Sequence, residues 1–425
     1  MADVLYVCYE FPSLSQTFIS NEFLELRRSG VNVRALALYR AHPEDLGRRE
    51  RKLADETLCV LRPGLLAGLG DLCWALARRP GRTARAIARL TRGEAPPRRW
   101  AAYASHLLYA CHVARRVDLA DISVFHAHFA TGPASVAMFL GLLTGKPFTV
   151  VAHAYDIYLD RMALGLKLET AAAFVTISNE NREWLIHRYG APARNVRVIH
   201  CGVDTRSLAV PAVDARPSDP PLIVTVGRLA PKKGHDTLIR ACDVLRERGV
   251  AFACQIVGAG DEQAELQGLI DRFGLTRQVR LVGPLPHDQA LALTARASVA
   301  TLACRQIADG DRDGIPVSLM EAMALGVPVV STRVSGIPEL VHHDQNGLLV
   351  EQDDPAALAS ALGALLRDEE RRRALGAAGR RTVEEEFDLT RNTATMRFLL
   401  ESVAPALRDT SEGTASPLGA AFRAG

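Results

Sequence analysis

The chain has 425 residues, enough for two hydrophobic cores, and its 48% hydrophobic and 23% charged residues are ordinary for a globular protein. Its 51 lysines and arginines nearly balance 48 aspartates and glutamates, and a formal charge of +3 excludes a general nucleic-acid-binding protein. The eight cysteines include no C-x-x-C pair, which favours free thiols in a reducing compartment. Without a signal-peptide pattern or an apolar run of ~18–20 residues, we expect a soluble, cytoplasmic protein.

Short apolar runs alternate with helical patterns along most of the chain, which is typical of parallel strands covered by helices on both faces. In the first half, the expected strands are Val4–Cys8, Val33–Leu38, Ile122–Phe125, Phe148–Val151, Phe174–Ile177 and Val196–Ile199. A proline-rich polar stretch, Val210–Pro221, is interpreted as a linker. In the second half, the expected strands are Leu222–Val226, Phe252–Val257, Val279–Val282, Val299–Leu302 and Val327–Ser331. The pattern predicts an α/β protein with two doubly wound, Rossmann-like domains that bind ligand at the carboxyl ends of their strands.

One segment of the first half departs from this alternation because it is rich in arginine. Between Arg78 and Arg99 the chain carries eight arginines and a single acidic residue, Glu94. Two interpretations remain open. The segment is either a solvated helical face or a surface that docks on an anionic membrane, where each basic residue contributes ~1 kcal/mol.

Two cations follow the first strand of the second half. Arg228 stands at the end of the strand and Lys233 stands just before the next helix begins. An arginine fork and a lysine point charge, together with the unpaired N–H groups of a helix start, suit a diphosphate. Such a cluster alone is more often a solvated turn, so the prediction depends on the motif that comes next.

That motif spans Asp309–Pro328. Gly314 and Pro316 predict a tight approach into a helix at about Val317–Leu325, whose first amides would face an anion. Asp313 lies in the loop and Glu321 lies one to two turns into the helix. Two carboxylates so placed would bind hydroxyls at different parts of one elongated ligand.

Metal and dinucleotide interpretations of these loops are less favoured. The aspartates before Gly314 imitate the start of a calcium loop, but Glu321 comes one residue too late to be its bidentate ligand. Asp311-Arg312-Asp313 mimics a metal-binding Asp-x-Asp motif, and an acidic loop that only caps the helix is also open. Gly258-Ala259-Gly260 lacks the third glycine of a dinucleotide fingerprint and predicts a strand-to-helix turn.

Histidines stand at two strand ends of the first half. His126 and His128 alternate, so both face one side, where they would bind a metal if a third ligand joined them. No third ligand has suitable spacing, and we expect no metal. His153 follows the next strand with Asp156 nearby, and it is either a hydrogen-bonded core histidine or a functional one.

Taken together, these motifs resemble glycosyltransferase family 4, the large retaining group with the GT-B fold, and especially its colanic-acid and exopolysaccharide biosynthesis members. The similar blocks are Phe11–Ile19, His126–Ala130, His153–Tyr158, Cys201–Asp204, Gly227–Gly234, Asp313–Glu321 and Ser331–Glu339. Two departures stand out. The family usually has Glu at the place of Asp313, and Ser13–Thr17 replaces a common Gly-Gly loop.

The resemblance implies an acceptor-binding domain at 1–207 and a nucleotide-sugar-binding domain at 208–388, facing each other across a cleft. A helix at 389–408 would return to the first domain, followed by a disordered tail at 409–425. It also implies transfer of a hexose-type sugar from a nucleoside-diphosphate sugar to a glycan or polyprenyl-linked oligosaccharide, with retention. Cationic side chains would neutralise the leaving group, so no metal or cofactor is expected.

The resemblance assigns roles to individual residues. The donor would be bound by Arg228, Lys233, Glu321, Gly314, Ile315, Pro316, Leu285 and Ser15. His153 and Asp313 would be catalytic, and His126, His128 and Asp156 would lie on the acceptor side. A nucleotide-sugar epimerase on the same fold, a non-catalytic sugar-nucleotide-binding scaffold and a pyridoxal-phosphate phosphorylase remain as alternatives. A position at the inner face of the membrane is a further open expectation.

Overall fold

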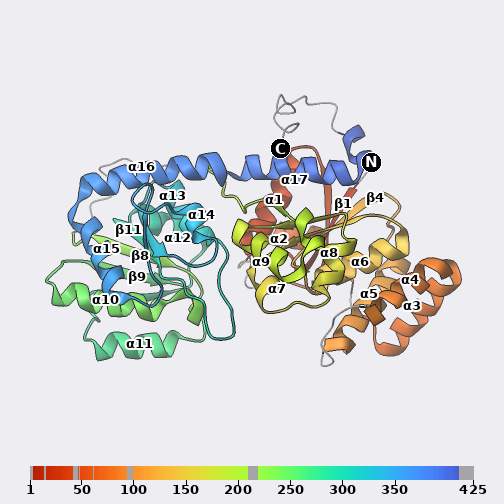
Figure 1. Cartoon of the computed structure of the whole chain (residues 1–425), viewed down its shortest axis with the longest axis horizontal. Helices are drawn as coiled ribbons and strands as arrows, with labels where there is room; N and C mark the ends of the chain where they lie inside the picture. The colour runs from red at the N-terminus through yellow and green to blue at the C-terminus, as the bar shows by residue number, and fades with distance from the viewer. Residues whose placement is uncertain are drawn as a thin grey trace.

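The structure, a computed structural model, describes residues 3–13, 16–41, 46, 48–60, 62–92, 99–208 and 219–410. It contains two parallel β-sheets, one in each half of the chain, with helices packed on them (Figure 1). We call the parts built around these sheets the N-terminal and C-terminal domains. The expected fold class, two doubly wound Rossmann-like domains, is confirmed.

The N-terminal sheet has the strand order β3-β2-β1-β4-β5-β6-β7. Its strands are β1 (Asp3–Glu10), β2 (Asn32–Tyr39), β3 (Leu58–Cys59), β4 (Ile122–His128), β5 (Phe148–Ala152), β6 (Ala173–Thr176) and β7 (Arg197–Val198). Its helices are α1 (Thr17–Arg28), α2 (Arg48–Glu56), α3 (Leu65–Arg78), α4 (Pro80–Arg92), α5 (Trp100–Arg116), α6 (Gly132–Thr144), α7 (Ala154–Tyr158), α8 (Leu164–Thr170), α9 (Asn179–Tyr189) and the 3₁₀ helix η4 (Ala191–Asn195).

The C-terminal sheet has the order β10-β9-β8-β11-β12-β13. Its strands are β8 (Leu222–Val226), β9 (Ala253–Val257), β10 (Val279–Gly283), β11 (Val299–Leu302), β12 (Val329–Thr332) and β13 (Leu348–Val350). Its helices are η6 (Pro231–Lys233), α10 (His235–Glu247), α11 (Gln263–Arg272), α12 (His287–Ala295), α13 (Val317–Ala324), α14 (Ile337–Leu340), α15 (Pro355–Arg367) and α16 (Glu369–Glu386). The chain ends its described part with α17 (Leu389–Val403) and η7 (Pro405–Thr410).

In both sheets the strand order reverses beside the first strand. β1 lies between β2 and β4, and β8 lies between β9 and β11. Open parallel sheets bind ligands outside the carboxyl ends of their strands at this reversal. The loops that follow β1, β4, β8 and β11 are therefore the first places to look for a site.

All eleven strands expected from the sequence are present, each within a few residues of its expected bounds. The short strands β3 and β13, which lie at edges of their sheets, were not predicted. They have two and three residues, too few for an apolar run or an alternating pattern to be recognised.

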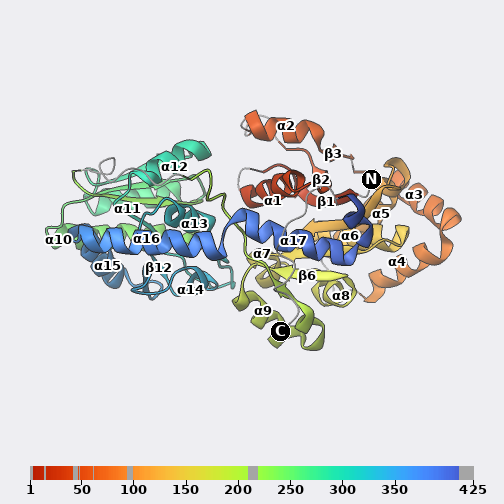
Figure 2. The same cartoon turned by 90° about the horizontal axis from the view of Figure 1, so that it is seen from above.

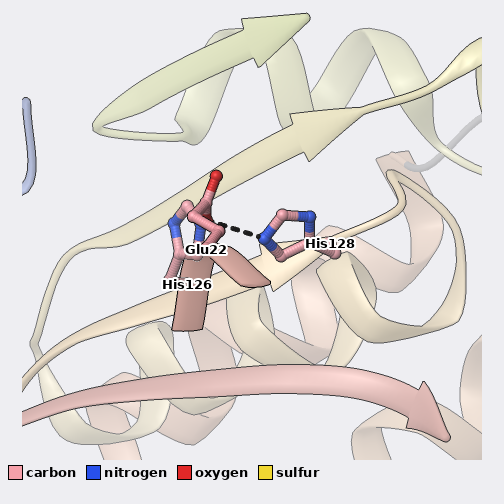
Figure 3. Close-up of side chains that lie close together, drawn as sticks. All are labelled: Glu22, His126 and His128. Atoms are coloured by element: carbon pink, nitrogen blue, oxygen red, sulfur yellow. Dashed lines mark hydrogen bonds and ion pairs between the residues drawn. The ribbon is translucent and has the colours of Figure 1, made fainter. Parts of the chain in front are cut away.

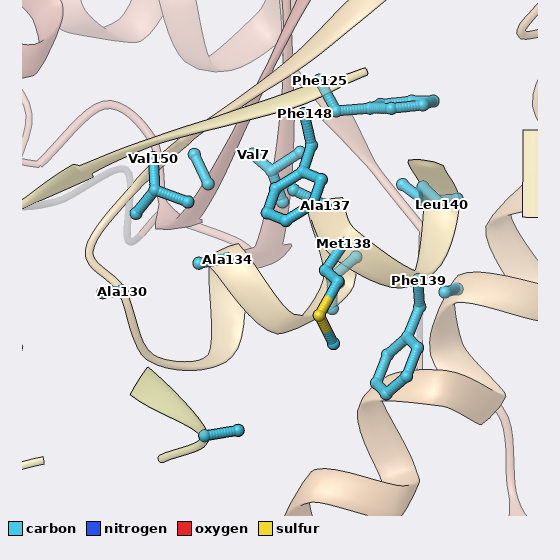
Figure 4. Packing of buried hydrophobic residues seen from close by; sticks show 14 of the residues in the cluster. Val7, Phe125, Ala130, Ala134, Ala137, Met138, Phe139, Leu140, Phe148 and Val150 are labelled. Carbon is cyan, nitrogen blue, oxygen red and sulfur yellow. The ribbon is translucent and has the colours of Figure 1, made fainter. Parts of the chain in front are cut away.

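The core of the N-terminal domain surrounds α6, which is apolar on all sides. Eleven of its 13 residues are buried, because the helix lies between the sheet and the outer helices α4 and α5. Figure 4 shows Phe148 of β5 next to Ala137 and Met138 of this helix. Phe139 points away from that strand, and its ring centre lies 5.4 Å from that of Tyr103 on α5. This packing fixes the start of α6 and the loop that leads to it from β4.

The helix α17 lies on the N-terminal domain although it follows the C-terminal domain in the chain. It continues the line of α16 across both domains (Figure 2). Met396 and Leu400 pack in the same core cluster as Phe23 of α1, and the Arg397 guanidinium donates to the Ser29 carbonyl at 2.6 Å. None of the described helices is long and apolar enough to cross a membrane.

Candidate active site

The loop after β8 carries the two cations predicted to bind phosphate. Arg228 is exposed, and its guanidinium makes no ion pair within the described part of the chain. Lys233, at the end of η6, lies with its Nζ 2.5 Å from Oδ2 of Asp313. The loop thus presents one unpaired cation and one that is held by a carboxylate.

Two glycines in the loop after β9, the strand next to β8, lie against the backbone of the Arg228 loop. A Cβ on Gly258 would lie 1.9 Å from the Gly227 oxygen, and one on Gly260 would lie 2.2 Å from the Leu229 oxygen. The Leu229 amide donates to the Ala259 carbonyl at 2.9 Å. The Gly258-Ala259-Gly260 segment is the predicted turn between β9 and α11, and its glycines permit close contact of two backbones.

Asp313 is surrounded by lysines. Its Oδ1 lies 3.6 Å from Nζ of Lys232, which in turn lies 3.0 Å from Oδ1 of Asp311. Burial would raise the pKa of Asp313, but the charges of Lys233 and Lys232 lower it below its ordinary value. Burial would likewise lower the pKa of Lys233, and Asp313 raises it by more. Both groups are charged at neutral pH, and the lysines lie close enough to offset the negative charge of the acidic loop.

Glu321 lies on α13, one to two turns from the start of the helix, as predicted. Its Oε1 is 2.7 Å from Nε2 of His287, the first residue of α12. The hydrogen bond to Glu321 raises the pKa of His287 above its ordinary value. Leu285, which is expected to contact the base, is half-buried in the loop just before His287. Because His287 contacts Glu321, the expected base contact and the expected ribose contact lie near each other. His287 was not recognised from the sequence.

The start of α13 faces the N-terminal domain. Gly314, Ile315 and Pro316 are buried, and no side chain caps the helix at Pro316. A Cβ on Gly314 would lie 2.8 Å from Cδ1 of Ile177 and 3.9 Å from Cβ of Ala154. The predicted anion-binding helix start therefore meets the loops after β5 and β6, next to His153.

Further contacts join the domains around this point. Glu339 of α14 accepts hydrogen bonds from the amides of Asn179 and Glu180 at 2.9 and 3.0 Å, and from Nε2 of His200 at 3.2 Å. A carboxylate at the N-terminus of α9 is favoured by the unpaired amides and the helix dipole. The Arg312 guanidinium lies 3.6 Å from the centre of the Tyr158 ring. The sequence predicted neither contact.

Glu339→Gln is expected to open the cleft, because a charged acceptor contributes about 1.5–3 kcal/mol through such bonds. Burial would raise the pKa of Glu339, but hydrogen bonds from His200 and the two α9 amides lower it. A lowered pKa means that the contact is intact above the ordinary pKa near 4.5 and is lost as pH falls through the lowered value. Small-angle X-ray scattering at pH 7 should show a larger radius of gyration for the variant and unchanged circular dichroism. An unchanged radius would contradict the role of Glu339.

Asp156 lies at the start of α7 but does not face the cleft. It is fully buried, its Oδ1 accepts from the His153 amide at 2.7 Å, and its Oδ2 accepts from the Ala130 amide at 2.5 Å. Burial raises its pKa to about 7. Asp156 was expected on the acceptor side, and in the structure backbone amides of the N-terminal domain donate to both of its oxygens. It joins the loops after β4 and β5.

His153 lines a small cavity between α1, the ends of β4 and β5, and α17. Its ring lies between Phe18 and Phe129, with ring centres 4.8 and 4.6 Å away, and its Nε2 is 3.4 Å from Nδ1 of His128. Burial lowers its pKa to about 3, so the imidazole is neutral. His128, which was expected on the acceptor side, lines the same cavity.

His126 differs from the expectation. It is 0% exposed and its Nδ1 lies 2.7 Å from the Thr149 hydroxyl, so it faces the domain interior and not the acceptor side. Glu22 of α1 lies beside it, a residue more than 100 positions earlier that spacing rules did not find. Ser15 lies outside the described residues, and its predicted phosphate contact stays a prediction.

Two Rossmann-like domains, each with a parallel sheet, that meet at the start of α13 are typical of the GT-B class of fold. The chain superimposes on Anabaena Alr3699/HepE in complex with UDP with a TM-score of 0.71 and 16% identity, covering 95% of this chain and 100% of that one. Its sequence matches the model for Glycosyltransferase Family 4 over residues 64–207 and that for Glycosyl transferases group 1 over residues 209–382.

Two bacterial relatives are similar over most of their length. The putative colanic acid biosynthesis glycosyltransferase WcaL of Escherichia coli is 34% identical, covering 84% of this chain and 88% of the relative. The amylovoran biosynthesis glycosyltransferase AmsK of Erwinia amylovora is 32% identical, covering 89% and 94%. The chain therefore belongs to glycosyltransferase family 4 and is a glycosyltransferase.

Proposed function

We propose that the enzyme transfers a hexose-type sugar from a nucleoside-diphosphate sugar to a growing glycan or polyprenyl-linked oligosaccharide during exopolysaccharide assembly. The two long relatives, which are named for colanic acid and amylovoran biosynthesis, support the pathway class. The similar HepE fold has been solved with UDP-glucose, which supports a nucleotide sugar as donor. Retention of anomeric configuration follows from the family resemblance.

The observation that carries the proposal is the junction of Arg228, Lys233 and Asp313 beside the start of α13. Arg228 has no partner among the described residues and is free to bind a phosphate oxygen, while Lys233 is oriented by Asp313. Helix-start amides near Gly314 add donors on the side that faces the N-terminal domain. The cations Arg228 and Lys233 suit the diphosphate of an elongated donor, and Asp313 with the amides near Gly314 suits its sugar.

The chemistry requires charge stabilisation. The bond between the anomeric carbon and the diphosphate oxygen breaks, and the nucleoside diphosphate leaves with the electron pair. An acceptor hydroxyl oxygen forms the new bond to that carbon and loses its proton. Arg228 and Lys233 stabilise the charge on the leaving group, and fixed donors of this kind are usually the largest catalytic contribution. The donor site in this proposal uses no metal and no cofactor.

A thermal-shift panel of nucleoside diphosphates and nucleotide sugars tests the donor class and names the base, uridine or guanosine. We expect one diphosphate and its sugar conjugate to raise the melting temperature, and Arg228→Ala to remove the shift. No shift with any member would refute the donor site. Transfer to an added acceptor distinguishes a transferase from a nucleotide-sugar epimerase, which releases product without an acceptor, and from a scaffold, which releases none.

We further propose that the α3–α4 region docks on an anionic membrane, with an apolar face of α3 as its main contact. Leu66 is 86% exposed and Leu69 43% exposed on one side of this helix, at the end of the molecule away from the C-terminal domain (Figure 1). The arginines expected to contact lipid divide into two groups. Arg79 and Arg82 donate to carbonyls at the end of α6, whereas Arg78 and Arg85 remain exposed.

Leu66→Ser with Leu69→Ser is expected to reduce co-sedimentation with vesicles containing anionic lipid at least several-fold, because it removes the apolar area that enters the interface. Phe398→Ser is the matched control, since that side chain is 52% exposed on α17. Raised salt should weaken the binding of the wild-type protein. Equal sedimentation of wild-type and double variant, or no dependence on anionic lipid, would refute the docking surface.

A further inference from the structure

Partly buried Glu22 and the buried His126 and His128 form a cluster in the N-terminal domain (Figure 3). Glu22 comes from α1 and the two histidines from the end of β4. Oε1 of Glu22 is 3.1 Å from Nε2 of His128 and 3.6 Å from Nε2 of His126. The three ligand atoms lie within 4.8 Å of one another, and the histidines are 0% and 2% exposed.

Both imidazoles are oriented by a second partner and turn the same atom toward Glu22. Nδ1 of His126 lies 2.7 Å from the Thr149 hydroxyl, and Nδ1 of His128 lies 3.4 Å from Nε2 of His153. A histidine that binds a metal through Nε2 usually has such a partner on Nδ1. The Nε2 atoms of both rings therefore face Glu22, where a common ligand would lie.

Among the residues that the structure describes, the buried Nε2 atom of His126 has no hydrogen-bond partner. The Glu22 oxygen beside it lies at 3.6 Å, beyond hydrogen-bond distance. A buried polar atom without a partner is unfavourable, so an occupant between these groups would remove that penalty.

The separations between Glu22 and the two histidines are close to those around a tetrahedral metal. Zinc bonds of about 2.0–2.1 Å to nitrogen and oxygen place neighbouring tetrahedral ligands about 3.3 Å apart. The distances of 3.1 and 3.6 Å fall on either side of that value, and all three ligand atoms lie within 4.8 Å of one another. The Tyr6 hydroxyl donates to Oε1 of Glu22 at 2.5 Å, which orients the carboxylate as ligating carboxylates usually are.

We infer that Glu22, His126 and His128 bind a divalent transition metal of the zinc class. Two histidines and one carboxylate leave the fourth position open, and the small cavity lined by Glu22, His128 and His153 adjoins the cluster. The metal joins α1 to β4, and through His128 it fixes the imidazole that contacts His153. This site is distinct from the donor site, where two cations neutralise the diphosphate.

Metal content tests the inference without an activity assay. Full-length protein from zinc-supplemented culture, purified without histidine tags or chelators, is expected to hold about one zinc per chain by mass spectrometry. His126→Asn with His128→Asn should reduce that content at least tenfold, while His343→Asn, a change of an exposed histidine, should leave it unchanged. Thr149→Val should weaken zinc affinity about 10–100-fold, because it removes the partner of Nδ1.

Cobalt keeps the test decisive if the double variant fails to fold. Wild-type protein reconstituted with Co²⁺ should show the intense visible absorption of a tetrahedral site. Wild-type protein with less than a tenth of an equivalent of zinc and no such absorption would overturn the inference, and the cluster would then be a hydrogen-bonded triad. Either result leaves the donor-site proposal standing, because that proposal is tested by nucleotide binding.

Discussion

Arg228→Ala and Lys233→Ala are each expected to lower kcat about 10²–10³-fold, since one fixed donor to a developing anion contributes ~3–4 kcal/mol. Arg228 is exposed and unpaired within the described chain, so its loss removes a ligand contact and little of the fold. Lys233 also pairs with Asp313, but Lys232, 3.6 Å from that carboxylate, remains as a second cation. The double variant should be at least as slow as either single one.

The control for these substitutions is Arg246→Ala. Arg246 forms an exposed ion pair with Asp243 on α10, the helix that follows the cation loop, and such pairs contribute about 0–1 kcal/mol. Its kcat and melting temperature should match the wild type. Steady-state kinetics with the donor identified by thermal shift measure the effect. A double variant that turns over at the wild-type rate, with an unchanged melting temperature, would exclude this loop as the diphosphate site.

Lys232 shows why the order of the two lysines in this loop matters. It is buried, and its Nζ lies near both Asp311 and Asp313, whereas Nζ of Lys233 pairs with Asp313. Two adjacent lysines in a sequence cannot be told apart by composition. In the structure they approach different oxygens of Asp313, at 3.6 Å for Lys232 and 2.5 Å for Lys233, and Lys232 also reaches Asp311.

The fold was predictable because the sequence patterns that indicate its strands and turns each lie within a few consecutive residues. Apolar runs such as Leu222–Val226 and Ile122–Phe125 are long enough to predict buried strands, and glycines at strand ends predict the turns. The donor loops were predictable for the same reason, since Arg228 and Glu321 belong to continuous motifs. Within one motif, the chain order itself places the residues on a strand end or a helix start.

The contacts missed by sequence reasoning join distant segments. Glu22 and His126 are 104 positions apart, and Glu339 and Asn179 are 160 apart. No periodicity links such positions, because their proximity arises only when α1 packs beside β4 or when the two domains meet. The same reason applies to the hydrogen bonds of Asp156, since its two amide donors come from the separate loops after β4 and β5.

Lys167→Met is expected to destabilise the N-terminal domain by about 3–5 kcal/mol, because each buried carbonyl left without a donor costs about 1–3 kcal/mol. Lys167 is 0% exposed, and its Nζ donates to the carbonyls of Ala130, Thr131 and Met162 at 2.6, 2.9 and 2.7 Å. Methionine keeps the volume but removes the donor to the Ala130 and Met162 carbonyls. The Thr131 carbonyl also loses its bond from Lys167, but it still accepts from the amide and hydroxyl of Ser135 at 3.0 and 2.9 Å. For a domain of about 200 residues, the melting temperature should fall by roughly 6–20 °C.

Lys146→Met separates this effect from the general loss of a lysine. Lys146 also donates to two carbonyls, those of Leu119 and Ala120, but it is only partly buried, so water replaces the lost donor. Its melting temperature should change by a few degrees at most. Because Lys167 joins the loops after β4 and after α7, and Asp156 joins the same β4 loop to His153, Lys167→Met should also lower kcat at temperatures where the variant is folded. Equal melting temperatures for the two variants would show that the three carbonyls find other partners and that Lys167 does not hold these loops.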